Sequence, residues 1–175
     1  MEDDEYKFEE SDDPRTWGYS DELVPDCEHP PVTAETYWRD FAQLVDACGR
    51  VAYHWKMARN CAAKEANSAK RVAEEYHRNL LYYRRSKKEC VFEAKRLFSI
   101  WQLDAHTLGV EFHLDDEKKR AFLNSLALDS DKRKCARSTI KYARSKGLLL
   151  SFEEIEGRFE KHLERVQKRQ NKDPF

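Results

Sequence analysis

Glycine and proline are scarce in this chain, and their scarcity favours long helices. The 175 residues include only five of each, and between Tyr37 and Leu103 there is no proline and a single glycine, Gly49. Because these two residue types are the ones that interrupt helices, that stretch can remain helical over its whole length. Charged residues make up 37% of the chain, and the mean hydropathy is −0.92. Such a composition is typical of helices with wide solvated faces.

Long apolar runs are missing as well. No stretch approaches the 18 or so apolar residues of a membrane span, and the first thirty residues are acidic where a signal peptide would be basic and then apolar. The five cysteines are odd in number and scattered, which argues against a disulfide scaffold and favours a reducing compartment. We expect a soluble intracellular protein, in the cytoplasm or in a nucleoid or nucleus, without a membrane partner.

Sequence motifs for catalysis or metal binding are also lacking. There is no glycine-rich phosphate loop, no His-Glu-x-x-His run and no Gly-x-Ser-x-Gly elbow. Cys27, His29, Cys48 and His54 do not have a common zinc spacing. The acidic pairs at 115–116 and 153–154 fall where helices should begin, so helix capping explains them. We therefore expect neither an enzyme nor a bound cofactor or metal.

What the chain does have is an apolar seam with alternating spacings of four and three residues. The seam predicts a coiled-coil type of helix. Its phase continues through residues 59–68, where a turn would normally shift it, so we predict one very long helix over 34–104. From Phe41 to Trp101 that helix would measure about 90 Å. The seam positions are Phe41, Val45, Cys48, Ala52, Trp55, Arg59, Ala62, Ala66, Ala69, Ala73, Tyr76, Leu80, Tyr83, Lys87, Cys90, Ala94, Leu97 and Trp101.

A lone helix cannot bury its own seam, so this pattern predicts a partner. The partner would be another protein or a second copy in a homo-oligomer. Bulky residues occupy both ends of the seam and alanines its middle, which indicates a close helix crossing there. The candidate protein-interaction residues in the seam are Ala62, Ala66, Ala69 and Ala73.

Residues 1–33 form a separate acidic segment. Residues 1–30 carry a net charge of −10, which leaves +9 on the other 145 residues. Four prolines and the lack of a helical period predict an extended or disordered arm. Trp17 and Tyr19 interrupt the acidity and are further candidate protein-interaction residues. The arm could fold back on the basic remainder, fill pockets on another protein, or imitate phosphates toward a basic cleft.

Residues 113–171 predict a small head of three short helices. The first spans about 115–127, the second runs from Ser130 or Asp131 to Gly147, and the third runs from Ser151 to about residue 170. Ser151 and Glu154 have the spacing of a capping box. No segment alternates like a strand. The predicted fold class is therefore all-α, with one very long helix, a three-helix head packed against its end, and an acidic arm.

Two basic segments make nucleic acid a possible partner. Residues 56–98 carry a net charge of +7, and the predicted helix 131–146 carries seven basic residues against one acidic residue. Our first hypothesis is a non-enzymatic helical interaction or assembly protein. The alternatives are a nucleic-acid-binding packaging factor and a small viral or mobile-element inhibitor acting through the acidic arm. The candidate nucleic-acid residues are Arg78, Arg84, Arg85, Lys88, Arg133, Lys134, Arg137 and Lys141.

A short part of the second basic segment resembles a known motif. Residues 138–142, followed by Gly147 and Leu148, are similar to the recognition helix of MerR-type winged-helix regulators over about twelve residues. The chain differs in the turn before this helix, in the residues after Tyr142 and in the order of its parts, so we infer no membership. The resemblance implies a basic helix that enters a groove.

Overall fold

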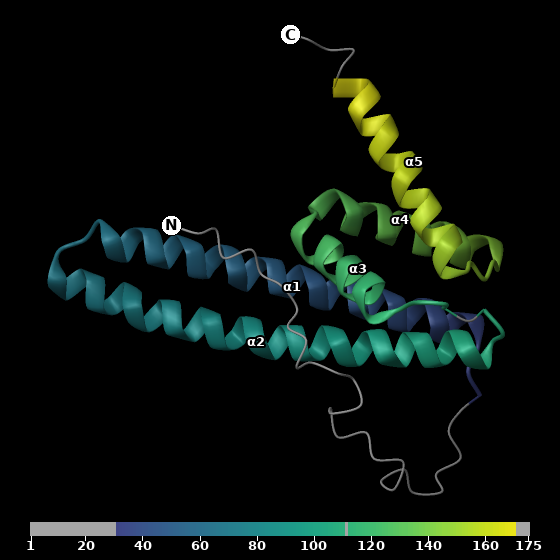
Figure 1. The fold of residues 1–175 in the computed structure, drawn as a ribbon, viewed down its shortest axis with the longest axis horizontal. Coiled ribbons are helices and arrows are strands. Elements are labelled where there is room, and N and C mark those ends of the chain that lie inside the picture. The colour runs from purple at the N-terminus through teal and green to yellow at the C-terminus, as the bar shows by residue number, and fades with distance from the viewer. Residues whose placement is uncertain (1–30, 111, 171–175) are drawn as a thin grey trace, which may run out of the picture.

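The computed structural model describes residues 31–110 and 112–170, so most of the predicted acidic arm, including Trp17 and Tyr19, lies outside the described residues. Within those ranges all regular structure is helical, which confirms the all-α prediction. None of the described helices is long and apolar enough to cross a membrane. The helices are α1 (Ala34–Ala66), α2 (Lys70–Thr107), α3 (Asp116–Leu128), α4 (Ser130–Lys146) and α5 (Phe152–Gln170) (Figure 1).

The prediction of one continuous helix over 34–104 is wrong. The chain turns at residues 67–69, and α1 and α2 lie side by side as an antiparallel hairpin (Figure 1). Two side chains in the turn bind carbonyls of the last turn of α1. Asn67 Nδ2 donates to the Ala63 carbonyl at 2.9 Å, and Ser68 Oγ donates to the Lys64 carbonyl at 2.6 Å. Asn and Ser commonly make such local bonds where a helix ends.

The two halves of the seam face each other within this one chain. Phe41 and Trp101, its first and last residues, stack with ring centroids 4.2 Å apart. A hairpin needs the same apolar spacing on both helices as a long coiled coil does. Because the turn is three residues long, the heptad pattern continues in phase from α1 into α2. The spacing of the apolar residues alone therefore fits both one continuous helix and a hairpin. Much of the seam is therefore covered by the chain itself.

The four seam alanines surround the tip of the hairpin. Ala66 and Ala69 are exposed beside the turn, whereas Ala62 packs against a small cluster of Ala58, Cys61 and Leu80. A contact between His77 Nδ1 and Glu65 Oε1, at 2.9 Å, joins the two helices near the same end. The small side chains lie where the two helices converge into a tight turn. Of the four alanines only Ala62 packs against this cluster, so the close crossing predicted from them stays a prediction.

The three short helices share one core with the base of the hairpin. Trp101 is fully buried there and contacts the rings of Phe41, Phe112 and Phe122. The first turns of α1 are also bonded to the segment between α4 and α5. Tyr37 Oη donates to the Leu150 carbonyl at 2.7 Å, and Trp38 Nε1 donates to the Leu148 carbonyl at 2.8 Å. The head therefore packs along the hairpin base, while the hairpin tip projects away from it (Figure 1).

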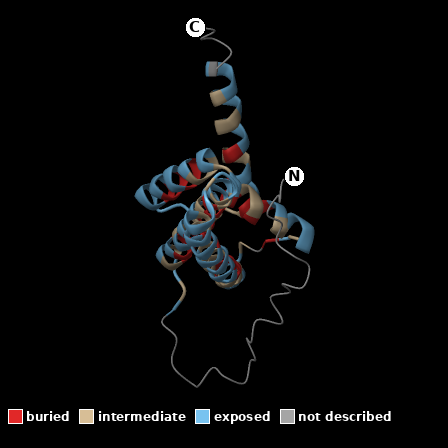
Figure 2. Cartoon of the chain, turned by 90° about the vertical axis from the view of Figure 1, so that its left-hand side faces the viewer, coloured by how far each residue is buried: buried red, intermediate tan, exposed pale blue. Residues whose placement is uncertain are grey.

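Local signals explain where the short helices begin and end. Gly147 ends α4 in the left-handed conformation, with φ 63°, which favours glycine. Ser151 and Glu154 form the predicted capping box, in which Ser151 N–H donates to Glu154 Oε2 at 2.7 Å and Glu154 N–H donates to Ser151 Oγ at 3.3 Å. From that cap α5 extends outward, and its far half is exposed or only half-buried (Figure 2).

We expect Trp101→Ala to lower the free energy of unfolding by about 3–5 kcal/mol, since it removes one of the two tryptophans of the shared core. The double variant Ala66→Leu/Ala69→Leu should change it by less than about 0.5 kcal/mol, because both positions are exposed. Urea denaturation followed by circular dichroism measures both. A large loss of stability in the Ala66→Leu/Ala69→Leu variant would contradict the hairpin.

Two buried carboxyls meet at the base of the hairpin. Asp40 of α1 and Asp104 of α2 are each only 5% exposed. Burial, with the neighbouring Asp40 carboxyl adding to it and the Arg39 guanidinium opposing it, raises the pKa of Asp104 to about 7. Arg39 Nε donates to Asp40 Oδ1 at 3.1 Å, so Asp40 is the member of the pair with a cationic partner.

This pair makes stability depend on pH. Because the folded state binds the Asp104 proton more tightly than the unfolded chain does, stability should fall as pH rises from about 4 to about 7. Asp104→Asn should remove about 2–3 kcal/mol of the stability difference between about pH 5 and pH 8. Urea midpoints at both pH values test this. Asp46→Asn, at an exposed carboxyl of α1, is the control and should leave the difference in place.

Candidate nucleic-acid interface

Helix α4 is basic along the edge that faces α1. The adjoining face of the helix carries small and apolar side chains and is buried against the core through Cys135, Ala136, Ile140 and Ala143. The basic residues recur at intervals of three or four along the neighbouring edge, which places them in one row on a helix. The row is Arg133, Arg137, Lys141 and Arg144, with Lys134 beside it. Because the apolar face packs against the core, the basic side chains are held along the edge of α4 that faces α1.

Two adjoining hollows separate this row from α1. One has a volume of about 560 Å³ and is lined by Arg50 and Asp46 of α1 together with α4. The other has a volume of about 320 Å³ and includes Ala42 of α1. Arg137 lines both, so we treat them as one surface and call it the α1–α4 groove. Its basic residues are Arg50, Arg133, Lys134, Arg137, Lys141 and Arg144.

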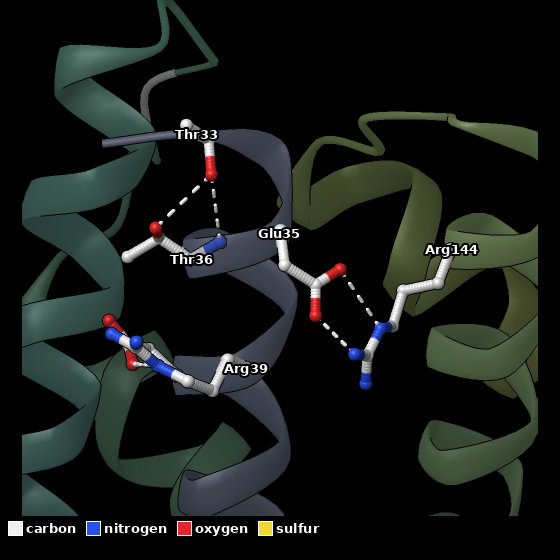
Figure 3. Close-up of polar contacts among 6 residues, drawn as sticks. Thr33, Glu35, Thr36, Arg39 and Arg144 are labelled. Carbon is white, nitrogen blue, oxygen red and sulfur yellow. Dashed lines mark hydrogen bonds and ion pairs between the residues drawn. The ribbon is translucent and has the colours of Figure 1, made fainter. Parts of the chain in front are cut away.

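Two ion pairs hold α4 against α1 along this groove. Arg144 binds Glu35 through both carboxylate oxygens, with Nε 3.2 Å from Oε2 (Figure 3). Further along, Arg137 Nη2 lies 3.3 Å from Asp46 Oδ1. Both pairs are substantially exposed, so each contributes little stability. Lys134 Nζ also lies 3.8 Å from Asp131 Oδ1, so three carboxylates accompany the six basic side chains and the groove keeps a net positive charge.

Arg133 has a structural role in addition to its charge. Its Nη1 donates to the carbonyls of Leu126 and Ala127, both at 2.8 Å, at the C-terminal end of α3. A cation suits that end of a helix because the unpaired carbonyls there carry partial negative charge. Burial lowers the pKa of Arg133, and the nearby Arg137 charge lowers it further. Arg133 therefore links α4 to the end of α3 and also lines the groove.

The remaining predicted nucleic-acid residues lie elsewhere. Arg78, Arg84, Arg85 and Lys88 are exposed on α2, and Arg85 Nε lies 3.3 Å from Glu89 Oε1. Helix α4 packs on α1, α3 and α5, and α2 lies on the other side of α1 from it (Figure 1). The two predicted basic sets therefore do not form one surface. The hairpin fold separates them.

Sequence reasoning missed Arg50 as a groove residue. Arg50 belongs to a different helix from the α4 row and is 83 positions from Arg133. Only the packing of α1 on α4 brings it there. Its spacing of four from Asp46 indicated the same face of α1, but nothing in the sequence indicated what that face would meet.

The segment similar to MerR recognition helices is only partly exposed. Thr139 and Ile140 are buried, whereas Ser138, Lys141 and Tyr142 are exposed, and the Cζ of Arg158 lies 4.5 Å from the Tyr142 ring centroid. The described residues also contain no strand that could form a wing. Lys141 is the residue of this run that belongs to the basic edge of α4.

Metal ligation finds no support in the described part of the chain. Cys48 is fully buried in the core, and burial raises its thiol pKa to about 12. Among residues 31–110 and 112–170 there is no group of three or more His, Cys, Asp or Glu side chains that could hold an ion. Cys27 and His29 lie outside the described residues.

No protein-family model, no curated protein and no solved structure matches this chain. The chemistry of the α1–α4 groove is therefore the basis on which its function is proposed.

We expect Arg133→Met to lower the free energy of unfolding by about 1–3 kcal/mol. It keeps the aliphatic stem but leaves the two α3 carbonyls without their charged donor. Lys134→Met removes the same charge from an exposed neighbour and should change stability by less than about 0.5 kcal/mol. Equal losses in the two variants, measured by urea denaturation, would contradict the structural role of Arg133.

Proposed function

We propose that this protein is a non-enzymatic nucleic-acid-binding protein that holds a phosphate backbone in the α1–α4 groove. The observation that carries the proposal is the excess of six basic side chains over the three carboxylates paired with them, those of Glu35, Asp46 and Asp131, along one groove. Lysine and arginine that neutralise phosphates release condensed counterions, which is the main source of affinity in sequence-independent binding. Guanidinium groups also bind phosphate oxygens in pairs.

The length of the basic row suits a backbone. Arg133 and Arg144 are eleven residues apart on one helix, a distance of about 16 Å. One strand of a duplex advances about 3.4 Å per nucleotide, so the row matches about five nucleotides. Contacts of this kind set position and affinity but do not read base sequence. We therefore propose binding with little sequence preference and a steep dependence on salt.

Assembly with another copy or another protein is a second proposal. It is favoured by Leu81, Tyr82 and Leu103, which are 51%, 63% and 62% exposed on α2. Large exposed apolar side chains are enriched at protein contacts. Because much of the heptad seam is covered within the chain, this proposal concerns the outer side of α2. Light scattering of the full chain, with and without DNA, separates assembly from nucleic-acid binding.

We expect the full chain to bind a short DNA duplex, and Lys134→Glu/Lys141→Glu to weaken that binding at least about tenfold at physiological salt. The salt slope of the variant should be shallower by about 2, since two phosphate contacts are lost. Fluorescence anisotropy of labelled duplex over a salt series measures both.

The matched control is Arg78→Glu/Lys88→Glu. It makes the same charge change at exposed positions of α2 and should keep most of the affinity. No binding of single-stranded or double-stranded DNA, either by the full chain or by a variant in which Asp21, Glu22, Asp26 and Glu28 are changed to their amides, would overturn the proposal. Loss of affinity in the control alone would move the interface to α2.

A further inference from the structure

The α1–α4 groove begins beside the point where the acidic segment enters the structure. Pro31 is the first described residue, Thr33 caps α1, and Glu35 of the next turn is bound to Arg144 at one end of the groove (Figure 3). Residues 1–30 are therefore tethered a few residues from a strongly basic surface. Tethering at so short a distance gives an intramolecular ligand a high effective concentration.

The charges of the two parts are complementary. Residues 1–30 carry a net charge of −10, and the rest of the chain carries +9. Residues 21–28, which come shortly before Pro31 in the sequence, include Asp21, Glu22, Asp26 and Glu28 around the apolar Leu23 and Val24. The groove likewise combines basic side chains with apolar contacts, since Ala42 and Ile140 line its second hollow.

The lengths also match. The groove follows α1 from Glu35 to about Tyr53, which is about 27 Å at helical rise. An extended chain covers that distance with about eight residues, because each adds about 3.3 Å. Residues 21–28 number eight.

We propose that residues 21–28 of this chain occupy the α1–α4 groove of the same molecule as an acidic intramolecular ligand. The carboxylates of the segment take the places that phosphates would take. Binding of the segment in the groove does not require nucleic acid. Its regulatory consequence, competition with DNA for the groove, rests on the proposed function. The contact should weaken with salt, because it depends on exposed charges.

Site-specific photocrosslinking of the full chain tests the occupation directly. With benzoylphenylalanine in place of Leu23, we expect low-salt crosslinks in the monomer that mass spectrometry maps to residues 34–53 and 130–146. High salt and the variant Lys134→Glu/Lys141→Glu should each reduce them at least about fivefold. Arg78→Glu/Lys88→Glu, with the same charge change on α2, should leave them unchanged.

Other outcomes overturn the proposal. Crosslinks that map to α2, that are absent, or that persist in the groove variant would show that the segment does not occupy the groove. Mixing isotopically labelled and unlabelled chains identifies crosslinks between two copies, and a majority of such crosslinks would assign the groove to a partner molecule instead.

A second measurement separates this inference from the proposed function. Changing Asp21, Glu22, Asp26 and Glu28 to their amides should raise DNA affinity severalfold at physiological salt. If the crosslinks lie in the groove but no form of the protein binds DNA, the intramolecular ligand stands and the proposed function falls. If DNA binds through the groove but the amide variant and the crosslinks show no effect of the segment, the proposed function stands and this inference falls.

Discussion

The fold depends on burying the apolar seam by packing its two halves, on α1 and α2, against each other. α1 and α2 together present far more apolar surface along one line than a solvated helix tolerates, and the hairpin buries it by bringing Phe41 against Trp101. Everything else is built on that contact. The aromatic rings of α3 and α5 close around Trp101 from the other side, and the packing of α3, α4 and α5 on this base fixes the edge of α4 that faces α1.

The electrostatics of the groove follow from this packing. Helix α4 is basic along one edge, but a basic helix edge alone is an ordinary solvated face. It becomes a concave charged surface only because the apolar face of α4 packs into the shared core, which brings α1 and its Arg50 to the opposite wall. Asp46 and Glu35 each pair with one arginine of α4, and the remaining positive charge is available to an anionic ligand.

Most local features could be predicted from the sequence, and the failure has an identifiable cause. Caps at Ser151 and Gly147 and the acidic first turn of α3 set the short helices close to their predicted bounds, because these signals act over three or four residues. The hairpin turn was missed because Asn67 and Ser68 are weak breakers and the heptad phase runs through them. Arg133, Lys134, Arg137 and Lys141 could be named from α4 alone. The position of Arg50 in the groove, and the separation of the α2 arginines from α4, depend on which side of α1 each helix packs. Heptad spacing does not indicate that side.

The bonds from Tyr37 and Trp38 to the Leu148 and Leu150 carbonyls have a consequence for how the chain acquires its structure during synthesis. They join residues 110 or more positions apart, so the N-terminal turns of α1 leave the ribosome long before their acceptors do. The hairpin can close as soon as α2 has been made, but the aromatic face of α1 stays open until the α4–α5 segment emerges. Contacts of such high sequence separation slow folding. These two bonds can therefore form only after the chain has been made as far as Leu150.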